Sequence, residues 1–335
     1  MRALQISQYQ AAVQLTEIAK PTITADQLLI EVVAASVNPV DYKIQQGAGK
    51  YVLGNRLPLT LGHDFSGIVR EVGSAVKQYQ VGDRVFGRVP KTGSFCDYVA
   101  VEANDIAQAP TSVSLVEAAA VPLVGLTAIQ GLTEGLQVQD GQTILITGGA
   151  GGVGSAAIAI AHALGVKVVT TASPAGAAFL ADYQPETIMN YQTTKLKDSV
   201  THVDGVFDTR GGQDLIDSFS VVKTGGKVAT IVSLPTADFG QKLGFGFWQQ
   251  QILRMLTHRY TKLARAKAAS FYAFFTQSNS DQLAFIAKLI DKGAYPIRIE
   301  QQFPLVQGQQ AIDLVKQGHV KGKVVLVLKT DEQLL

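Results

Sequence analysis

A glycine-rich turn is the stretch of this sequence best suited to hold a phosphate. Residues 143–147, TILIT, indicate a strand, and an alanine-rich helical run begins at Ser155. Between them, Gly149, Gly151 and Gly154 have the spacing G-x-G-x-x-G. A side chain at the first two positions would hold the backbone away from a pyrophosphate, and one at the third would hold the helix away from the strand. Free N–H groups at the helix N-terminus, together with its dipole, then favour an anion.

The strand, turn and helix together predict a dinucleotide site. The alternative is a glycine-rich turn in an α/β protein that binds no ligand. The residues expected to contact the cofactor here are Gly149, Ala150, Gly151, Gly152, Val153 and Gly154.

The end of the second strand bears on which nicotinamide is bound. An NAD site usually has an acidic residue there, about 20 residues beyond the turn, which binds the ribose 2′-hydroxyl. This chain has Thr170–Ser173 instead, with no acid to repel a 2′-phosphate. The pattern favours NADPH over NADH. Ser173 either donates to the phosphate or caps the following helix.

Composition excludes several classes of function. A length of 335 residues suggests two domains, and a net charge of +2 without a basic run lacks the footprint of a nucleic-acid binder. The longest apolar stretches, Ala118–Ile129 and Ala156–Val166, are shorter than the roughly 20 residues that a bilayer requires. The N-terminus lacks the apolar region of a signal peptide, and Cys96 is the single cysteine. We expect no membrane or nucleic-acid partner and a cytoplasmic location.

Two regions of the chain, which differ in their predicted secondary structure, must position these residues. Residues 1–101 contain short β runs, such as Leu28–Ala34 and Phe65–Val72, between Gly, Pro and Asn turns, which predicts hairpins and a partly closed barrel. Residues 142–276 alternate strands and helices, as in a doubly wound sheet. A helical pattern over 117–132 is interrupted at Pro122.

The expected strands of the second region are Thr143–Ile146, Val166–Thr171, Thr187–Met189, Gly205–Phe207, Lys227–Val232 and, at an edge, Phe271–Phe275. Two helices, Gln282–Asp291 and Gln307–Gln317, follow. The end strand, Lys323–Leu328, is expected to return to the first domain, so that the second region is an insertion.

Further motifs occur in order over almost the whole chain. They are Asn38-Pro39-Val40-Asp41, LGHDFSG at 61–67, VGDRVFG at 81–87, AAAVP at 118–122 with GLTA at 125–128, and Gly318-His319 with GKVV at 322–325. With them the chain resembles the medium-chain dehydrogenase/reductase superfamily, in its zinc-free quinone oxidoreductase group, which includes zeta-crystallin. The resemblance implies an α/β protein with a GroES-like β-rich catalytic domain at 1–118 and 277–335, a Rossmann domain at 119–276, and NADPH and substrate in a cleft between them.

Zinc is not expected. Zinc-dependent relatives use a cysteine, a histidine and a second cysteine, but Asn38 stands at the first position and Pro122 or Leu123 near the second. His63 alone cannot supply the three protein ligands of a catalytic zinc. We interpret His63 as a partly buried, hydrogen-bonded imidazole and Cys96 as a packing residue.

The resemblance also suggests cofactor contacts outside the glycine turn. Tyr191 matches a family tyrosine that lies over the phosphate and adenine side. Relatives often carry Lys or Arg just after the second strand, whereas this chain has Pro174–Ala177. Lys323, or a lysine elsewhere, is the candidate to compensate.

Without a metal there is no Lewis acid for an alkoxide, so alcohol oxidation is not expected. Hydride donation from NADPH to a quinone, or to the β-carbon of an enone or enal, remains. Asn38 is the first candidate to donate to the oxygen that gains charge, unless it only holds the turn before Pro39. Lys43 stands where many relatives have tyrosine; it protonates an enolate, holds an acceptor, or is solvated. Thr127 matches a family threonine beside the nicotinamide, or is an ordinary helix residue.

Aromatic residues suggest how the substrate or a second subunit is contacted. Glycines interleaved with aromatics over Phe239–Trp248 predict a mobile flap over a flat substrate, or a subunit contact. The resemblance implies a homodimer, because in this family the edge strand of the nucleotide domain commonly pairs across a dimer. Without such pairing, the strand Phe271–Phe275 would be an exposed apolar edge.

Three functions follow from these patterns. The first is an NADPH-dependent, zinc-independent quinone reductase, and the second an enal or enone reductase. The third, from another class, is an NADPH-binding, crystallin-like protein without useful turnover.

Overall fold

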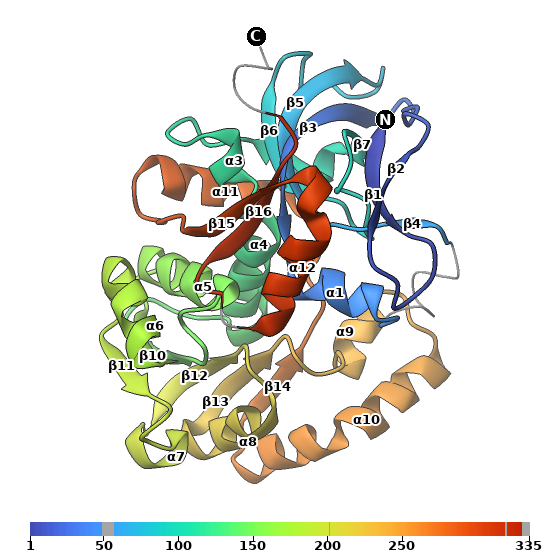
Figure 1. Ribbon diagram of the computed structural model, residues 1–335. Coiled ribbons are helices and arrows are strands. Elements are labelled where there is room, and N and C mark those ends of the chain that lie inside the picture. The colour runs from blue at the N-terminus through green and yellow to red at the C-terminus, as the bar shows by residue number, and fades with distance from the viewer. Residues whose placement is uncertain (49–56, 201, 319, 330–335) are drawn as a thin grey trace. The chain divides into compact units, whose positions relative to one another are not determined.

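The computed structural model describes residues 1–48, 57–200, 202–318 and 320–329 (Figure 1). The chain divides into two compact units. Unit 1 is Met1–Leu126 with Gln277–Leu335, and unit 2 is Thr127–Thr276. His319 of the closing motif lies outside the described residues.

Unit 1 is built on two sheets. The larger has the order β15-β16-β3-β5-β6-β8, with β7 also paired to β3, and the smaller has the order β2-β1-β4. Its strands are β1 (Arg2–Ile6), β2 (Gln14–Glu17), β3 (Gln27–Val37), β4 (Leu59–Thr60), β5 (Asp64–Val72), β6 (Arg84–Arg88), β7 (Tyr98–Glu102), β8 (Ile106–Gln108), β15 (Ile299–Pro304) and β16 (Lys323–Val327).

Strand β3 is the centre of this unit. Every residue from Leu28 to Val37 is buried, because β3 pairs with β5, β7 and β16. The pairing of β16 with β3 brings the end of the chain back to its beginning, as the sequence predicted; Figure 1 shows red β16 beside blue β3. Fully buried Phe65 and Phe95 fill the core.

Short helices complete unit 1. They are α1 (Pro39–Gln45), η1 (Ala103–Asp105), α3 (Leu115–Ala118), α11 (Ser280–Asp291), η4 (Leu305–Gln307) and α12 (Gly308–Gln317). Helix α4 (Pro122–Gln130) carries the chain from unit 1 into unit 2. Pro122 begins this helix rather than interrupting one, because a first-turn residue needs no N–H donor.

Unit 2 is a doubly wound sheet, and the predicted α/β fold class is confirmed. All strand pairs are parallel, in the order β11-β10-β9-β12-β13-β14. The strands are β9 (Thr143–Ile146), β10 (Lys167–Ala172), β11 (Thr187–Asn190), β12 (Val203–Asp208), β13 (Val222–Thr230) and β14 (Ser270–Ala273). The order reverses between β9 and β12, which is the place where such sheets bind ligands.

The helices of unit 2 connect these strands. They are η2 (Gly131–Leu136), α5 (Gly152–Ala163), α6 (Pro174–Phe179), η3 (Leu180–Tyr183), α7 (Leu196–Ser199), α8 (Gly212–Val221), α9 (Ala237–Lys242) and α10 (Phe247–Ala266). No helix among the described residues is both long and apolar enough to cross a membrane.

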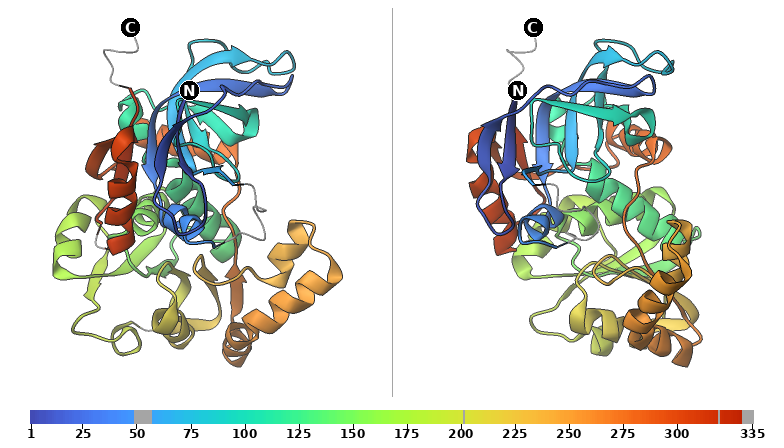
Figure 2. Two further views of the ribbon diagram at one scale, coloured as in Figure 1. Left: turned by 45° about the vertical axis from the view of Figure 1, so that its right-hand side comes forward. Right: turned by 90° about the vertical axis from the view of Figure 1, so that its right-hand side faces the viewer.

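The segment Phe239–Trp248, expected to be a flap or a subunit contact, comprises the end of α9, a turn and the start of α10. Both roles stay predictions. Phe239 is buried, whereas Trp248 is 77% exposed. Leu253 and Thr257 are buried one helical turn apart, and α10 packs against β14 (Figure 2). This spacing, together with Ala264, gives α10 its buried side.

The two ends of unit 2 meet. Thr127 and Thr276 are its first and last residues, and their hydroxyl oxygens lie 2.6 Å apart in a hydrogen bond. The chain therefore enters and leaves this unit at one place.

Candidate functional site

The glycine turn lies at the carboxyl end of β9. Gly148 has a φ of +70°, which favours glycine, and α5 begins after its N-cap Gly151. Because Gly151 has no side chain, no side-chain oxygen caps the first turn of α5. These N–H groups, at the positive end of the helix dipole, fit the pyrophosphate of a dinucleotide.

The three motif glycines are required for different reasons. A Cβ on Gly149 would lie 2.2 Å from Thr170 Oγ1, and one on Gly154 would lie 2.3 Å from the carbonyl oxygen of Gly148. A Cβ on Gly151 would have no neighbour nearer than 3.4 Å. Glycine is therefore required at 149 because any side chain there would collide with β10. The sequence had suggested a different reason, namely that a ligand approaches this glycine. Gly151 alone leaves space for a ligand.

Asp208 holds the strand ends around the turn together. Its buried carboxylate accepts hydrogen bonds from Thr147 Oγ1 at 2.9 Å, from Thr230 Oγ1 at 2.8 Å and from the backbone N–H of Gly211 at 3.0 Å. It thus ties β9, β12 and β13 to one another. Asp208 was not predicted as a functional residue, although its place at the end of an apolar strand was the available signal.

The two polar residues predicted beyond the turn have different surroundings. Ser173 is the N-cap of α6, where its Oγ accepts from the N–H of Gly176 at 3.2 Å. Tyr191 follows β11 and is 47% exposed, with the Arg210 guanidinium carbon 5.5 Å from its ring centroid. Their cofactor contacts stay predictions.

Unit 1 contains a second group of functional candidates, buried at the end of β3. Asn38 Nδ2 donates to Asp64 Oδ2 at 2.8 Å and to the carbonyl oxygen of Ser36 at 3.3 Å, and Asn38 Oδ1 accepts from Lys323 Nζ. Lys323 Nζ also lies 3.5 Å from Asp64 Oδ2. Both the NH2 group and the oxygen of the Asn38 side-chain amide are therefore engaged inside the protein.

Lys323 is the least expected member of this cluster. Its side chain is 8% exposed, and burial lowers the pKa of its ammonium while Asp64 and Asp41 act in the opposite direction. From the sequence, Lys323 was a candidate cofactor contact. In the structure its ammonium contacts Asn38 and Asp64, and the cofactor contact stays a prediction.

A buried pair lies beside the cluster. His63 Nδ1 lies 2.7 Å from Asp41 Oδ1, and Asp41 Oδ2 accepts from the backbone N–H of Asn38 at 2.7 Å. Asp41 thus braces the start of α1, while His63 is a hydrogen-bonded imidazole, as the sequence predicted.

The remaining catalytic candidates are not part of these clusters. Lys43 is exposed on α1. Thr127 is buried in α4, and its hydroxyl bonds to Thr276. Their catalytic roles stay predictions.

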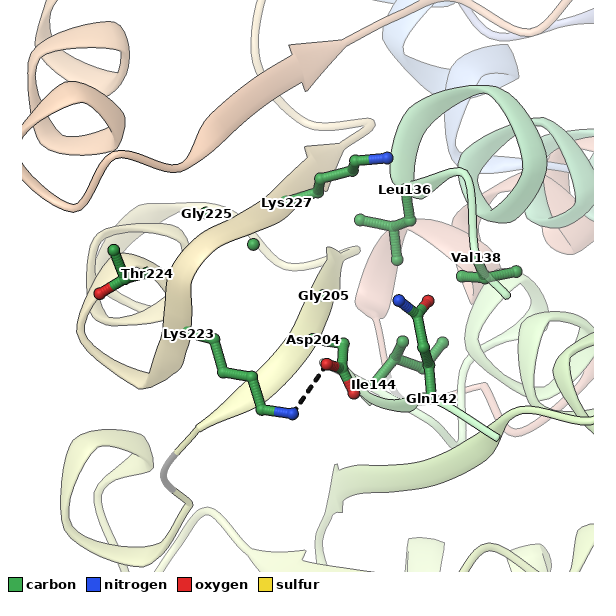
Figure 3. A pocket seen from close by; sticks show the side chains of 11 residues that line it. Leu136, Val138, Gln142, Ile144, Asp204, Gly205, Lys223, Thr224, Gly225 and Lys227 are labelled. Carbon is green, nitrogen blue, oxygen red and sulfur yellow. Dashed lines mark hydrogen bonds and ion pairs between the residues drawn. The ribbon is translucent and has the colours of Figure 1, made fainter. Parts of the chain in front are cut away.

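A pocket in unit 2 lies at the other end of the sheet (Figure 3). It is formed at the amino ends of β9, β12 and β13, where Lys223 Nζ donates to Asp204 Oδ1 at 2.7 Å. Ligands of doubly wound sheets bind at the carboxyl ends, so this pocket is separate from the glycine turn.

Comparison with known proteins identifies the family. The alcohol dehydrogenase GroES-like domain matches residues 24–111, and the zinc-binding dehydrogenase family matches residues 176–326. A chloroplastic NADPH-dependent alkenal/one oxidoreductase of Arabidopsis thaliana is 32% identical over 93% of this chain and 74% of its own length. The chain belongs to the medium-chain dehydrogenase/reductase superfamily. Unit 1 is accordingly its GroES-like part, and unit 2 its Rossmann-like part.

Two further relatives cover most of this medium-chain oxidoreductase. The mitochondrial NAD(P)H oxidoreductase RTN4IP1 of Mus musculus is 30% identical over 90% of this chain and 81% of its own length. The solved structure of the quinone oxidoreductase from Coxiella burnetii is 33% identical, with a TM-score of 0.86 over 98% of this chain and 99% of that one. These matches place the chain in the quinone oxidoreductase group.

One of the matching family models is described as a zinc-binding dehydrogenase, so the residues at the expected zinc position must be compared with a zinc site. Asn38 stands at the first ligand position, and its oxygen accepts from the ammonium of Lys323. Asp64 Oδ1 accepts from the backbone N–H of Leu123 at 2.7 Å, near the second cysteine position, and its Oδ2 faces Lys323. Within the described ranges, no three His, Cys, Asp or Glu residues are grouped to hold a metal. A cation already lies between these donors, so they do not fit a catalytic zinc.

Proposed function

We propose that this protein is a zinc-independent, NADPH-dependent oxidoreductase that transfers reducing equivalents to a quinone. The observation that carries the proposal is the glycine turn. Its uncapped helix N-terminus and open Gly151 lie at the carboxyl edge of the sheet, where the strand order reverses. The cluster of Asn38, Asp64 and Lys323 supports zinc independence, because an ammonium occupies the donors that zinc would need.

NADPH supplies the hydride when it is bound. The first-turn amides of α5 would hold its pyrophosphate, and the end of β10 lacks the carboxylate that would repel a 2′-phosphate. The NADPH-dependent relative from Arabidopsis supports the same choice over NADH.

The second candidate is reduction of the alkene of an enal or enone. It is favoured by the relative named an alkenal/one oxidoreductase, whereas the solved relative from Coxiella burnetii favours a quinone. Both reactions place new negative charge on a substrate oxygen, which a donor must stabilise.

The test is the loss of NADPH absorbance by the purified, chelator-treated protein. A small quinone and an α,β-unsaturated aldehyde are supplied in parallel, with NADH as the control nucleotide. We expect fast oxidation of NADPH with the quinone. Turnover with the aldehyde alone would make the protein an alkene reductase, and NADPH binding with neither acceptor consumed would support the crystallin-like alternative.

In this proposal Asn38 is the candidate donor to the substrate oxygen that gains charge. The substitution Asn38→Ala tests this role. To donate to the substrate oxygen, Asn38 Nδ2 must exchange one of the hydrogen bonds that it makes to Asp64 and Ser36. If it does so, we expect its loss to lower turnover strongly while NADPH affinity is kept. The measurement is kcat beside the dissociation constant of NADPH. Unchanged turnover would remove Asn38 from the mechanism.

We also propose that the protein is a cytoplasmic homodimer. Support for the dimer is that β14 pairs only with β13 among the described strands, which leaves one side of β14 as the edge of the sheet. The cytoplasmic location rests on the sequence alone, and the relatives include mitochondrial and chloroplastic proteins.

A further inference from the structure

Arg210 carries a cationic side chain beside Gly148 at the start of the glycine turn, and no role for it was predicted from the sequence. It follows β12 at the carboxyl edge of the sheet. Asp208 accepts from the backbone N–H groups of Arg210 at 3.2 Å and Gly211 at 3.0 Å, so the turn that carries the side chain is fixed. The position of the Arg210 backbone is thereby set by a buried carboxylate.

The side chain of Arg210 extends across the turn. A Cβ built on Gly148 would lie 3.0 Å from Arg210 Cδ and 3.2 Å from its Cγ, so the stem packs on this glycine. The guanidinium carbon lies 5.5 Å from the ring centroid of Tyr191, which follows β11. Because β10 lies between β9 and β11, the side chain runs from the end of β12 toward the β10 and β11 side.

This is the side on which doubly wound sheets bind the adenosine ribose, beside the end of the second strand. That strand, β10, ends at Ala172 and is followed by Ser173 and Pro174, with neither an acid nor a cation. A 2′-phosphate there needs a cation from another strand.

The Nη groups of the Arg210 guanidinium are available to donate hydrogen bonds to a ligand. Arg210 Nε lies 3.8 Å from Asp214 Oδ2, and both side chains are partly exposed, so this ion pair is weak. Among the described residues, neither Nη atom of Arg210 donates a hydrogen bond. Two N–H groups of a planar fork match two phosphate oxygens.

We propose that Arg210 binds the 2′-phosphate of the cofactor and selects NADPH over NADH, with Tyr191 holding its guanidinium in place. The inference rests on the proposed function, because it takes a dinucleotide at the glycine turn as given. The cation of the phosphate site would then come from the end of β12, whereas relatives often carry it at the end of β10.

Equilibrium binding tests this proposal without turnover. Dissociation constants are measured by calorimetry for NADPH, NADH, 2′,5′-ADP and 5′-AMP, with wild type, Arg210→Ala and Arg210→Lys. We expect Arg210→Ala to weaken NADPH and 2′,5′-ADP by about 10- to 100-fold and to change NADH and 5′-AMP less than about twofold. Arg210→Lys should lie between, because the charge is kept and the fork is lost.

Two further variants sharpen the experiment. Asp214→Asn removes the competing carboxylate, so NADPH should bind about two- to threefold more tightly. Arg254→Ala removes an exposed arginine of α10 and should change no constant. Thermal unfolding of each variant shows that the fold is kept.

The outcomes separate the inference from the proposed function. Equal weakening of NADPH and NADH in Arg210→Ala, or no change in either, would overturn the role of Arg210 while leaving the reductase in place. A wild-type protein that binds none of the four nucleotides would overturn both.

Discussion

At the scale of single residues, unit 1 contains a buried ammonium group. Lys323 lies beside Asp64, and each is almost fully enclosed. Removing one partner of such a pair leaves the other charge buried without compensation.

We expect Lys323→Met to lower the free energy of unfolding by about 3–5 kcal/mol, and Asp64→Asn to have a similar cost. The double variant should cost clearly less than the sum of the two, because neither charge is then left alone. Urea unfolding of the four proteins measures this coupling. Strictly additive losses would contradict the pairing.

Because of Glu31 in β3, the stability of unit 1 is expected to depend on pH in the acidic range. Burial opposes ionisation of its carboxyl, but hydrogen bonds from Lys329, Arg70 and Tyr98 prevail and lower its pKa to about 2. A carboxyl with a depressed pKa contributes stability above its unfolded value, near 4.5, and loses it as the pH falls toward 2.

We therefore expect Glu31→Gln to be less stable than wild type by about 1–3 kcal/mol at pH 7. The difference should shrink as the pH falls from about 4.5 toward 2, where the wild-type carboxyl takes up its proton. Denaturant unfolding at a series of pH values follows it, with the exposed Glu71→Gln as control. A constant difference down to pH 2 would be evidence against the role of Glu31.

At the scale of elements, the glycine turn separates residues that the fold needs from one that a ligand needs. We expect Gly154→Ala to destabilise unit 2, since its Cβ would lie 2.3 Å from a backbone oxygen. Gly151→Ala should fold normally and bind NADPH at least tenfold more weakly, because its methyl group enters the space left for the pyrophosphate. Thermal unfolding and NADPH titration of both variants distinguish the two roles. Normal NADPH binding by folded Gly151→Ala would place the phosphate elsewhere.

The sequence predicted elements better than it predicted contacts. The six strands of unit 2 each overlap an expected run, because β-branched and apolar residues mark them directly. A helix was expected before the last strand of unit 2, but the first residues of α10, Phe247 and Trp248, fell within the segment expected to be a flap, since aromatics and glycines there resemble a loop. The pairing of Lys323 with Asn38, and the reach of Arg210 to Tyr191, join segments far apart in the chain, and no local pattern encodes such contacts.

At the scale of the whole molecule, the open side of β14 predicts self-association. A subunit has a mass of 35.7 kDa, and we expect sedimentation equilibrium to give about twice this value. The result should hold over a wide range of protein concentration, because paired edge strands bury both backbones. A mass of one subunit at micromolar concentration would rule out the dimer.

The pairing of β16 with β3 also sets an order of events during synthesis. Unit 2 is complete once Thr276 has left the ribosome, whereas β3 must wait for β16 to be made. At about 5–20 residues per second that delay lasts several seconds. The inserted unit is therefore able to fold before β3 gains its last partner strand, β16.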